Sequence, residues 1–498
     1  KDDGFWGNTI TVINNIADKV LNLTLKDVKI DVSDTGDQYD WDQKGKAALS
    51  VQGKGNVEIE LDGDNELKSG TQSAGLEKTS TGTLTLKDDN NEAGSLTATG
   101  GFNSAGIGGG YLGDGKNITI TGGIVNATGN EDGAGIGGGS SGSGENITIT
   151  GGTVTATGGD FGAGIGGSNG GSGNNITIKG GTVTATGGGY RGNSGAGIGS
   201  GSSGSGENIT INDGKVTATG GNYAAGIGGG SVGAWGGDAG SGKNITINGG
   251  TVNATGTDGG AGIGGGENGN GEDITINGGK VNASGAYGGA GIGGGVNGIG
   301  SKVTVSGAAQ VTATATGSGP DWSGVGTGAT IGNGGSKTPD GPVDGKEIQA
   351  DISHLTTGYI HHIIYNPDLD LDGKPDGILK EWWEFALPKP IPDGESLDLH
   401  VETLKGAPLL FNTRQQGSTL RVTTDNLAAR LHGTRQALET LQEQGVEQIQ
   451  FVTTLKTTTL SVEDLLAEGG SWFALEHDGL GSRRLSAAQA ESLKCWRH

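Results

Sequence analysis

The strongest constraint on the fold is a phrase that recurs between residues 76 and 325. In each copy, Ala-Gly-Ile-Gly is followed by a Gly/Ser-rich link, Asn-Ile-Thr-Ile, Gly-Gly and Thr-Val-Thr-Ala-Thr-Gly. Successive copies lie 29 to 36 residues apart. The first apolar residue of each copy is Leu76, Ile107, Ile136, Ile165, Ile198, Ile227, Ile263, Ile292 or Val325. A fixed period of three short strand-like segments, without a helical pattern, is typical of a β-solenoid. We therefore predict a mainly β fold, a right-handed parallel β-helix with about 29 residues per coil.

Alternation within each phrase predicts which side chains face the inside of the coil. Both isoleucines of Asn-Ile-Thr-Ile are expected to point inward and the intervening Thr outward, and the Val and Ala of Thr-Val-Thr-Ala-Thr are expected inward. An Asn precedes most copies of Ile-Thr-Ile, at Asn117, Asn146, Asn175, Asn208 and Asn244, with Asp273 in the next place. We predict a stacked Asn ladder that satisfies backbone groups at a corner.

Changes in composition divide the chain. Residues 1–75 are expected to form irregular first coils and an N-terminal cap, residues 76–335 the regular solenoid, and residues 336–346 a linker. Beyond Glu347 glycine becomes sparse and helical spacing appears, so we predict a small C-terminal α+β domain over residues 347–498. A helix over residues 426–444, with Thr424 or Asp425 as its N-cap, is indicated by Leu427, Leu431, Leu438 and Leu441.

Composition also limits the class of function. The chain begins at Lys1, has no Met and contains no 18-residue apolar run, which favours a secreted protein whose signal peptide has been removed and which has no membrane span. Its single cysteine, Cys495, permits no internal disulfide. A net charge of −23 argues against nucleic acid or an anionic membrane as a partner.

One motif indicates a metal. Carboxylates at alternate positions, a Gly and a further carboxylate match the front of a calcium loop at Asp368, Asp370, Asp372 and Asp376. Leu379 stands where the closing Glu of such a loop belongs, and Glu381 or Glu384 is a replacement. The motif therefore predicts either a structural calcium site or a solvated acidic loop.

Aromatic residues recur in equivalent loops between the third phrase of one copy and the first phrase of the next. They are Phe102, Phe161, Tyr190, Tyr223 and Tyr287. Only 4% of the chain is aromatic, so this recurrence predicts a column along one edge of the solenoid. Such rings, with nearby Asn, Asp and backbone groups, are candidates for contact with carbohydrate. The alternative is that each ring covers and steadies its own glycine-rich loop.

Other functions find less support in the residues. The outward Thr column is compatible with ice binding, but Thr is also a good outward strand residue, and Lys215, Asn253, Lys280 and Asn282 interrupt the neighbouring strand face. Enzymes that act on polysaccharides need clustered carboxylates, whereas the acids of the coils occupy different places in the repeat. The pair His361 and His362 alternates across a predicted strand, so both cannot readily ligate one metal.

The Gly-Ala-Gly-Ile-Gly-Gly-Gly, Asn-Ile-Thr-Ile and Gly-Gly-Thr-Val-Thr-Ala-Thr-Gly-Gly segments resemble the glycine-rich repeat β-helix surface proteins of Gram-positive bacteria. These are often described as carbohydrate-binding-domain-containing proteins. The resemblance covers about residues 10–330 and implies a β-helix at a cell surface. The chain has no Leu-Pro-x-Thr-Gly sorting signal, so the resemblance does not extend to covalent wall anchoring.

These observations together predict a secreted or cell-surface, structural or adhesive solenoid that is not an enzyme and that binds glycans or other surface partners. A subunit of an extracellular filament, assembled through terminal strand exchange or end-to-end stacking, is the alternative. A β-helix enzyme that acts on polysaccharides is a weaker alternative.

Overall fold

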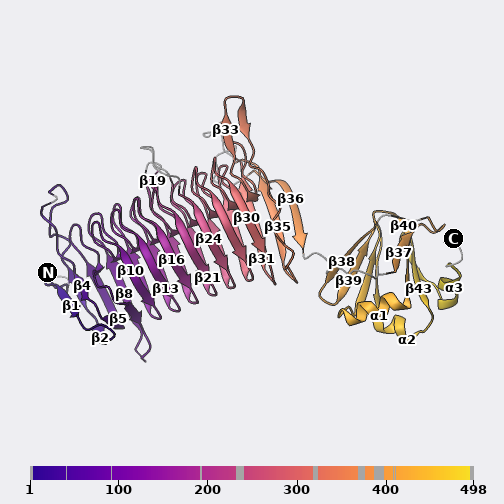
Figure 1. Ribbon diagram of the computed structural model, residues 1–498, viewed down its shortest axis with the longest axis horizontal. Helices are drawn as coiled ribbons and strands as arrows, with labels where there is room; N and C mark the ends of the chain where they lie inside the picture. Colours follow the sequence, from indigo (N-terminus) through magenta and orange to yellow (C-terminus); the bar gives the residue numbers. More distant parts are fainter. Residues whose placement is uncertain are drawn as a thin grey trace. The chain divides into compact units, whose positions relative to one another are not determined.

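The computed structural model describes residues 4–40, 42–90, 92–190, 193–231, 240–317, 324–367, 376–385, 398–407, 409 and 411–493. The chain divides into two compact units, residues 1–385 and residues 386–498. The first is a β-solenoid whose coils stack side by side, and the second is a smaller unit that contains the helices (Figure 1). Each unit is described by itself.

The coils form three walls of parallel strands, and each coil except the last contributes to all three. The strands of the first, the Ile-Gly wall, are β1 (Ile10–Asn14), β4 (Leu49–Gly53), β6 (Leu76–Lys78), β9 (Ile107–Gly108), β12 (Ile136–Gly137), β15 (Ile165–Gly166), β20 (Ile198–Gly199), β23 (Ile227–Gly228), β26 (Ile263–Gly264), β29 (Ile292–Gly293) and β32 (Ile331–Gly332).

The second wall, the Ile-Thr-Ile wall, follows the Gly/Ser-rich link. Its strands are β2 (Val20–Lys26), the first half of β5 (Asn56–Lys68), β7 (Leu84–Lys87), β10 (Gly115–Ile120), β13 (Gly144–Ile149), β16 (Gly173–Ile178), β21 (Gly206–Ile211), β24 (Gly242–Ile247), β27 (Gly271–Ile276) and β30 (Gly300–Val305).

The third wall, the Thr-Val-Thr wall, follows the Gly-Gly corner. Its strands are β3 (Lys29–Asp31), the second half of β5, β8 (Gly94–Thr99), β11 (Ile124–Thr128), β14 (Thr153–Thr157), β17 (Thr182–Thr186), β22 (Lys215–Thr219), β25 (Thr251–Thr255), β28 (Lys280–Gly285), β31 (Gln310–Thr316), β35 (Tyr359–Tyr365) and β36 (Ile378–Phe385). Two short hairpins project from the coils: β18 (Gly189–Tyr190) with β19 (Asn193–Ser194), and β33 (Ser336–Thr338) with β34 (Gly341–Val343).

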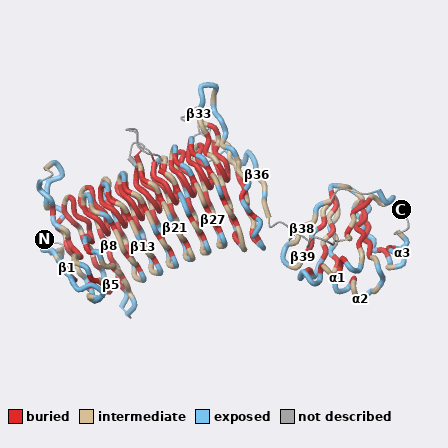
Figure 2. Tube along the Cα trace, in the orientation of Figure 1, coloured by how far each residue is buried: buried red, intermediate tan, exposed pale blue. Residues whose placement is uncertain are grey.

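Equivalent residues of successive copies lie opposite one another, which confirms the predicted stacking. Ile118 pairs with Ile147, and Ile147 pairs with Ile176. The inward isoleucines, valines and alanines are fully buried or nearly so, and they form a continuous core along the unit (Figure 2). The first coils join the same walls, because β1 and β2 pair in parallel with β4 and β5. Their lengths are uneven, since Ile10 pairs with Leu49 and Leu49 pairs with Leu76, 39 and 27 positions further along the chain.

Glycine is required in the Ile-Gly wall because neighbouring coils approach so closely there. Gly166 has φ +133°, and a Cβ at this position would lie 1.8 Å from the carbonyl oxygen of Gly199 in the next coil. No other residue fits that space or adopts that backbone conformation without strain. From β9 to β32 the wall therefore depends on the recurrence of Ile-Gly, whereas β1, β4 and β6 have other residues in the place of this glycine.

The Asn ladder is confirmed, with a different set of partners. These Asn residues have φ between +53° and +56°, a conformation that Asn tolerates. Asn146 donates to the side-chain oxygen of Asn117 at 3.1 Å, and Asn175 donates to Asn146 at 3.2 Å. The amides therefore bond mainly to one another, and Asn117 alone of these three donates to a backbone carbonyl, that of Thr81 at 3.1 Å.

The end of the solenoid differs from its prediction in two ways. Ile331, instead of Val325, takes the last place of the Ile-Gly wall, because Ile292 pairs with Ile331. In addition, β35 pairs in parallel with β31, and β36 pairs antiparallel with β35. These two strands belong to the solenoid, so the second unit begins at residue 386 instead of residue 347. The reason is that the exposed edge of β31 offers unpaired backbone groups that a further strand satisfies.

The second unit has two four-stranded sheets. One contains β37 (Leu399–Glu402), β40 (Ala428–Thr434), β43 (Trp472–Asp478) and β44 (Gly481–Arg484), and the other contains β38 (Asn412–Gln416), β39 (Thr419–Thr423), β41 (Gln448–Val452) and β42 (Thr457–Ser461). The helices are α1 (Arg435–Glu443), α2 (Val462–Ala467) and α3 (Ala487–Ser492). The mixed sheets and helices confirm the predicted α+β character.

The helix predicted over residues 426–444 is only half correct. Residues 428–434 form β40 between β37 and β43, and α1 begins afterwards with Thr434 as its N-cap. Leu438 and Leu441 are buried on α1, and Leu431 is buried in a strand, while Leu427 is 58% exposed. Pairing with two neighbouring strands outweighs helix spacing here, because tertiary context overrides local preference.

Candidate functional site

The outer face of the Thr-Val-Thr wall ends in a cluster of rings. Tyr359 and His361 on β35 continue the outward columns of Gln310 and Thr312. Across the antiparallel pair, Tyr359 lies opposite Phe385 and His361 lies opposite Trp383, so all four side chains share this face. We call Tyr359, His361, Trp383 and Phe385 the aromatic platform.

The rings of the platform contact one another closely. Trp383 stacks on His361 with 3.7 Å between ring centroids and 6° between planes, and it is nearly parallel to Phe385 at 5.8 Å. Tyr359 contacts Trp383 at 5.0 Å. Trp383 is nevertheless 45% exposed. A large apolar surface is therefore held in a fixed orientation and remains open to solvent. The apolar face of a ligand can pack against such a surface.

Polar contacts on the opposite face anchor this hairpin to the last coil. His362 is buried, its Nδ1 lies 2.6 Å from Thr330 Oγ1, and its ring stacks on Trp382 at 4.5 Å. The carboxylate of Glu347 accepts hydrogen bonds from Thr330 and Ile331. The platform thus rests on a rigid base, so little ordering is needed when a ligand binds.

The buried groups of this base have shifted pKa values. Burial lowers the pKa of His362 to about 4, and the charges of His361 and Lys380 add to the effect. Burial raises the pKa of Glu347 and of Glu384. His362 Nε2 lies 3.6 Å from Glu384 Oε1, beyond normal hydrogen-bonding distance. The neutral imidazole therefore serves as a packing and hydrogen-bonding group of the hairpin at neutral pH.

The aromatic residues predicted to form a column lie in the loops that precede the Ile-Gly strands. Phe102 and Tyr287 stand five residues before the anchoring isoleucine, and Phe161 and Tyr223 stand four before it. All four are half-buried. Tyr190 lies in β18, and its side chain is outside the described part of the structure. We call these loops the loop edge. The four residues lie in equivalent loops of their coils, and both the column of rings and the contact with carbohydrate stay predictions.

Two rings of the loop edge have an unusual backbone. Tyr223 has φ +65° and Tyr287 has φ +47°, a region that bulky residues rarely adopt. Burial raises the pKa of Tyr223, and the nearby carboxylates of Asp258 and Glu267 raise it further. Glu131, Asp258 and Asn103 have the same kind of backbone at the same places of other coils, so this conformation belongs to the turn of the repeat.

Acidic residues also gather at the loop edge. From the sequence, these residues were expected to occupy different places in the repeat. Burial raises the pKa of Glu131, and the carboxylates of Asp160 and Asp132 add to the shift. Asp132 accepts hydrogen bonds from Ser140 at 2.6 Å and Asn169 at 3.3 Å. Stacked copies bring these acids together because a residue of one loop lies beside the equivalent loop of the next coil.

The predicted calcium motif lies mostly outside the described residues. This applies to Asp368, Asp370 and Asp372, whereas Asp376 is described and its backbone amide donates to the carbonyl of Pro367 at 3.4 Å. Glu381 and Glu384 have other neighbours, because Glu381 Oε1 lies 2.6 Å from His361 Nε2 and Glu384 accepts from Gln349 at 2.9 Å. Within the described ranges, no group of three or more His, Cys, Asp or Glu side chains is arranged to hold a metal ion. Calcium binding stays a prediction.

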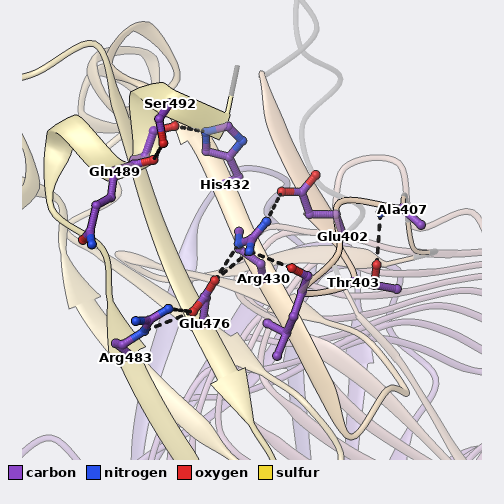
Figure 3. Close-up of polar contacts among 11 residues, drawn as sticks. Glu402, Thr403, Ala407, Arg430, His432, Glu476, Arg483, Gln489 and Ser492 are labelled. Atoms are coloured by element: carbon purple, nitrogen blue, oxygen red, sulfur yellow. Dashed lines mark hydrogen bonds and ion pairs between the residues drawn. The ribbon is translucent and has the colours of Figure 1, made fainter. Parts of the chain in front are cut away.

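A buried ionic network lies in the second unit (Figure 3). Arg430 on β40 donates to Glu476 Oε1 from Nε at 2.9 Å and from Nη2 at 2.7 Å, and to Glu402 Oε1 at 3.0 Å. Arg483 on β44 donates to the other oxygen of Glu476 at 2.6 Å. Each charge has partners of the opposite sign, which indicates a role in stabilising the unit.

Sequence analysis missed the platform because it ended the solenoid at residue 335. A signal was present, since Tyr359, His361 and Tyr365 alternate along one segment, and Trp383 and Phe385 along another. Both match the period of a strand. His361 and His362 were correctly predicted to lie on opposite faces of one strand.

Comparison with known proteins supports the fold. A family model described as a beta helix repeat matches residues 92–111, 118–140, 147–171, 176–202, 209–231, 245–267 and 274–296. No curated protein and no solved structure gives a significant match. In the described part of the chain, no helix is long and apolar enough to cross a membrane. The matched segments coincide with the stacked coils from β8 to β29, so the repeat match and the structure agree on a β-helix fold for this part of the chain.

Proposed function

We propose that this protein is an extracellular, non-catalytic adhesive solenoid that binds glycans. The observation that carries the proposal is the aromatic platform, where Trp383 remains 45% exposed while its ring stacks on His361 and lies nearly parallel to that of Phe385. Sugar rings present apolar C–H faces that pack against such rings, and their hydroxyls need polar partners beside them. Gln310 and Thr312 provide polar groups in the adjoining strand.

The loop edge supports the same function at a second place. Tyr223 combines a strained backbone with neighbouring carboxylates from Asp258 and Glu267, which can accept hydrogen bonds from sugar hydroxyls. The loops recur along the solenoid, so weak contacts at several copies would add up when one polymer engages them together. Repeated weak contacts are suited to adhesion.

A binding assay on the full chain tests this proposal. Glycan arrays and affinity electrophoresis should detect at least one bound polysaccharide, and Trp383→Ala should weaken that binding at least about 10-fold because an anchoring ring is lost. Trp6→Ala is the matched control, since Trp6 is 65% exposed at the other end of the solenoid. Equal binding by both variants and the parent chain would contradict a role for the platform. New reducing ends during incubation would indicate an enzyme instead.

A filament subunit is the second candidate, and the two ends of the solenoid favour it. In β2 the inward Leu21 and Leu23 are only half-buried, whereas the equivalent residues of later coils are fully buried. In β36 the exposed side chains include Ile378 at 50% and Leu379 at 60%. An uncovered strand edge can pair with a strand of another copy. Negative-stain images of native material should then contain continuous threads, whereas separate short rods would exclude it.

A further inference from the structure

The column that contains Tyr359 runs along the outer face of the Thr-Val-Thr wall. From the platform toward the first coils, strand pairing places Tyr359 beside Gln310, Gln310 beside Lys280, Lys280 beside Thr251, and Thr251 beside Lys215. Every second place in this stretch is therefore Tyr359, Lys280 or Lys215. Neighbouring strands lie about 4.8 Å apart, so successive members of this set are about 10 Å apart.

On the described strands of the Thr-Val-Thr wall from β8 to β31, the two lysines are the only charged outward side chains. From β8 to β31, all strands of which are described, the outward positions are otherwise occupied by Thr, Ser, Asn, Gln and Ile. Lys215 and Lys280 are both exposed, and the described residues place no carboxylate within ion-pair distance of either. A chain with a net charge of −23 thus has two cations on an otherwise uncharged stretch of wall, and at the platform end the carboxylate of Glu381 lies 2.6 Å from His361.

The surface between the lysines and the platform is rigid and polar. Asn282 donates to the side-chain oxygen of Asn253 at 2.8 Å in the column next to the lysines. Thr312 and Thr314 continue the rows toward the platform. Because strand pairing fixes these groups, they form an ordered set of donors and acceptors for hydroxyl groups.

We propose that this strip, from the platform to Lys215, binds a linear acidic polysaccharide that crosses the strands along the solenoid. A sugar ring packs on Tyr359 and Trp383, and carboxylates of the following units contact Lys280 and Lys215. The inference rests on the proposed glycan binding and adds the substrate class. Stacking on the platform contributes affinity, while the lysines distinguish an acidic chain from a neutral one.

The charge distribution favours a sparsely charged polymer over nucleic acid. Duplex DNA carries one charge per about 1.7 Å of its axis, and proteins that bind it neutralise many phosphates. Two cations about 10 Å apart on an acidic protein cannot do so. They match a chain in which single carboxylates are separated by uncharged ring surface.

The test compares two forms of one polymer with the full chain. Polygalacturonate and its fully methyl-esterified form share a backbone and differ in charge. We expect tighter binding to polygalacturonate, with an affinity that falls as salt rises. Lys215→Glu with Lys280→Glu should weaken binding to polygalacturonate at least about 10-fold and leave the ester unaffected. The double replacement by Arg should retain the preference, and Trp383→Ala should weaken binding of both forms.

The control is the double variant Lys54→Glu with Lys243→Glu, which changes the net charge equally at exposed positions outside this wall. If it weakens binding as much as the Lys215 and Lys280 variant does, or if both polymers bind equally, the acidic-ligand inference is overturned while glycan binding stands. If neither polymer binds, both the inference and the proposed function fail for this site. Displacement of polygalacturonate by single-stranded DNA at equal charge concentration would also overturn the inference.

Discussion

The solenoid and the second unit reach stability by different means. In the solenoid each coil contacts only its neighbours, and the core is a set of repeated columns such as Ile118, Ile147 and Ile176. In the second unit, residues from Leu399 to Leu475 converge on one core, beside which lies the buried network of Arg430. The solenoid is thus stabilised by contacts between neighbouring coils, and the second unit by contacts between residues far apart in the sequence. A destabilising substitution in one coil should therefore act locally, whereas one in the second unit should destabilise the whole unit.

The largest expected effect is in the Ile-Gly wall. Gly166→Ala should destabilise the solenoid by at least about 4 kcal/mol, because its Cβ meets backbone of the next coil and its φ is nearly restricted to glycine. Gly170→Ala in the same coil is the control. Gly170 has φ +73° with nothing within 4 Å of a Cβ, so about 1–2 kcal/mol is expected. Urea unfolding measures both, and equal losses would contradict the close-approach argument.

The second largest effect is expected from a substitution in the buried ionic network, and it tests whether the second unit unfolds as a whole. Arg430→Met leaves Glu402 without this partner and removes two hydrogen bonds to Glu476. We expect a loss of about 3 kcal/mol, near the low end for a broken buried pair, because Arg483 still contacts Glu476. Pulse proteolysis read by mass spectrometry should find residues 398–493 destabilised throughout. A response limited to β40 would contradict the cooperative behaviour assigned to this unit.

Acid should act on both units through a buried histidine. Burial lowers the pKa of His362 to about 4 and also lowers the pKa of His477. In each unit, the histidine therefore binds a proton in the unfolded state at a pH at which it stays neutral in the folded state. Stability is therefore lost as pH falls below about 6.5 toward the folded pKa. The loss of folding free energy caused by His362 alone is at most about 3 kcal/mol. The raised pKa values of Glu347 and Glu384 act in the opposite direction, so the net loss of stability in the solenoid should be smaller than this limit.

The two units should diverge below about pH 4.5. Burial raises the pKa of Glu476, but hydrogen bonds from Arg483 and Arg430 outweigh it and hold that pKa below its usual range. Its contribution is present above the unfolded pKa and disappears as pH falls through the folded pKa, so the second unit continues to weaken. Pulse proteolysis at a series of pH values follows both. His362→Gln should flatten the profile between pH 6.5 and 5 only in the solenoid, and His477→Gln only in the second unit. Identical pH profiles for both variants would contradict the assignment of one histidine to the acid response of each unit.

The smallest effect concerns the Asn ladder. Asn146→Ala removes hydrogen bonds to Asn117 and Asn175 and places Ala at φ +54°. Because the ladder is exposed, we expect a loss of about 1 kcal/mol. Asn146→Gly removes the same hydrogen bonds without the backbone strain, so it separates the two causes. A loss of several kcal/mol for the Gly variant would indicate that the ladder is essential for stacking.

The predictions that succeeded concern the repeated coils, whereas those that failed concern the last strands of the solenoid and the second unit. Burial of the Ile, Val and Ala columns was predictable, because every copy repeats one alternating pattern. The aromatic platform was not, because Tyr359 and Trp383 become neighbours only when β35 and β36 add to the edge of the wall. The strand β40 was mistaken for part of a helix because Leu431 fits a helical spacing with Leu427 before the strand and Leu438 after it.

By itself, the sequence determined the coil, its period, its inward face and the need for glycine in the Ile-Gly wall. Each of these depends on contacts between a residue and its equivalent one copy away, so repetition makes them visible. Only the tertiary structure decided which residue closes the Ile-Gly wall, where the solenoid ends, and which charges meet around Arg430. Glu476 lies 46 positions from Arg430 in the chain, and no periodic pattern connects them. Such contacts depend on how strands pair at an edge and pack around a core, which local preference does not encode.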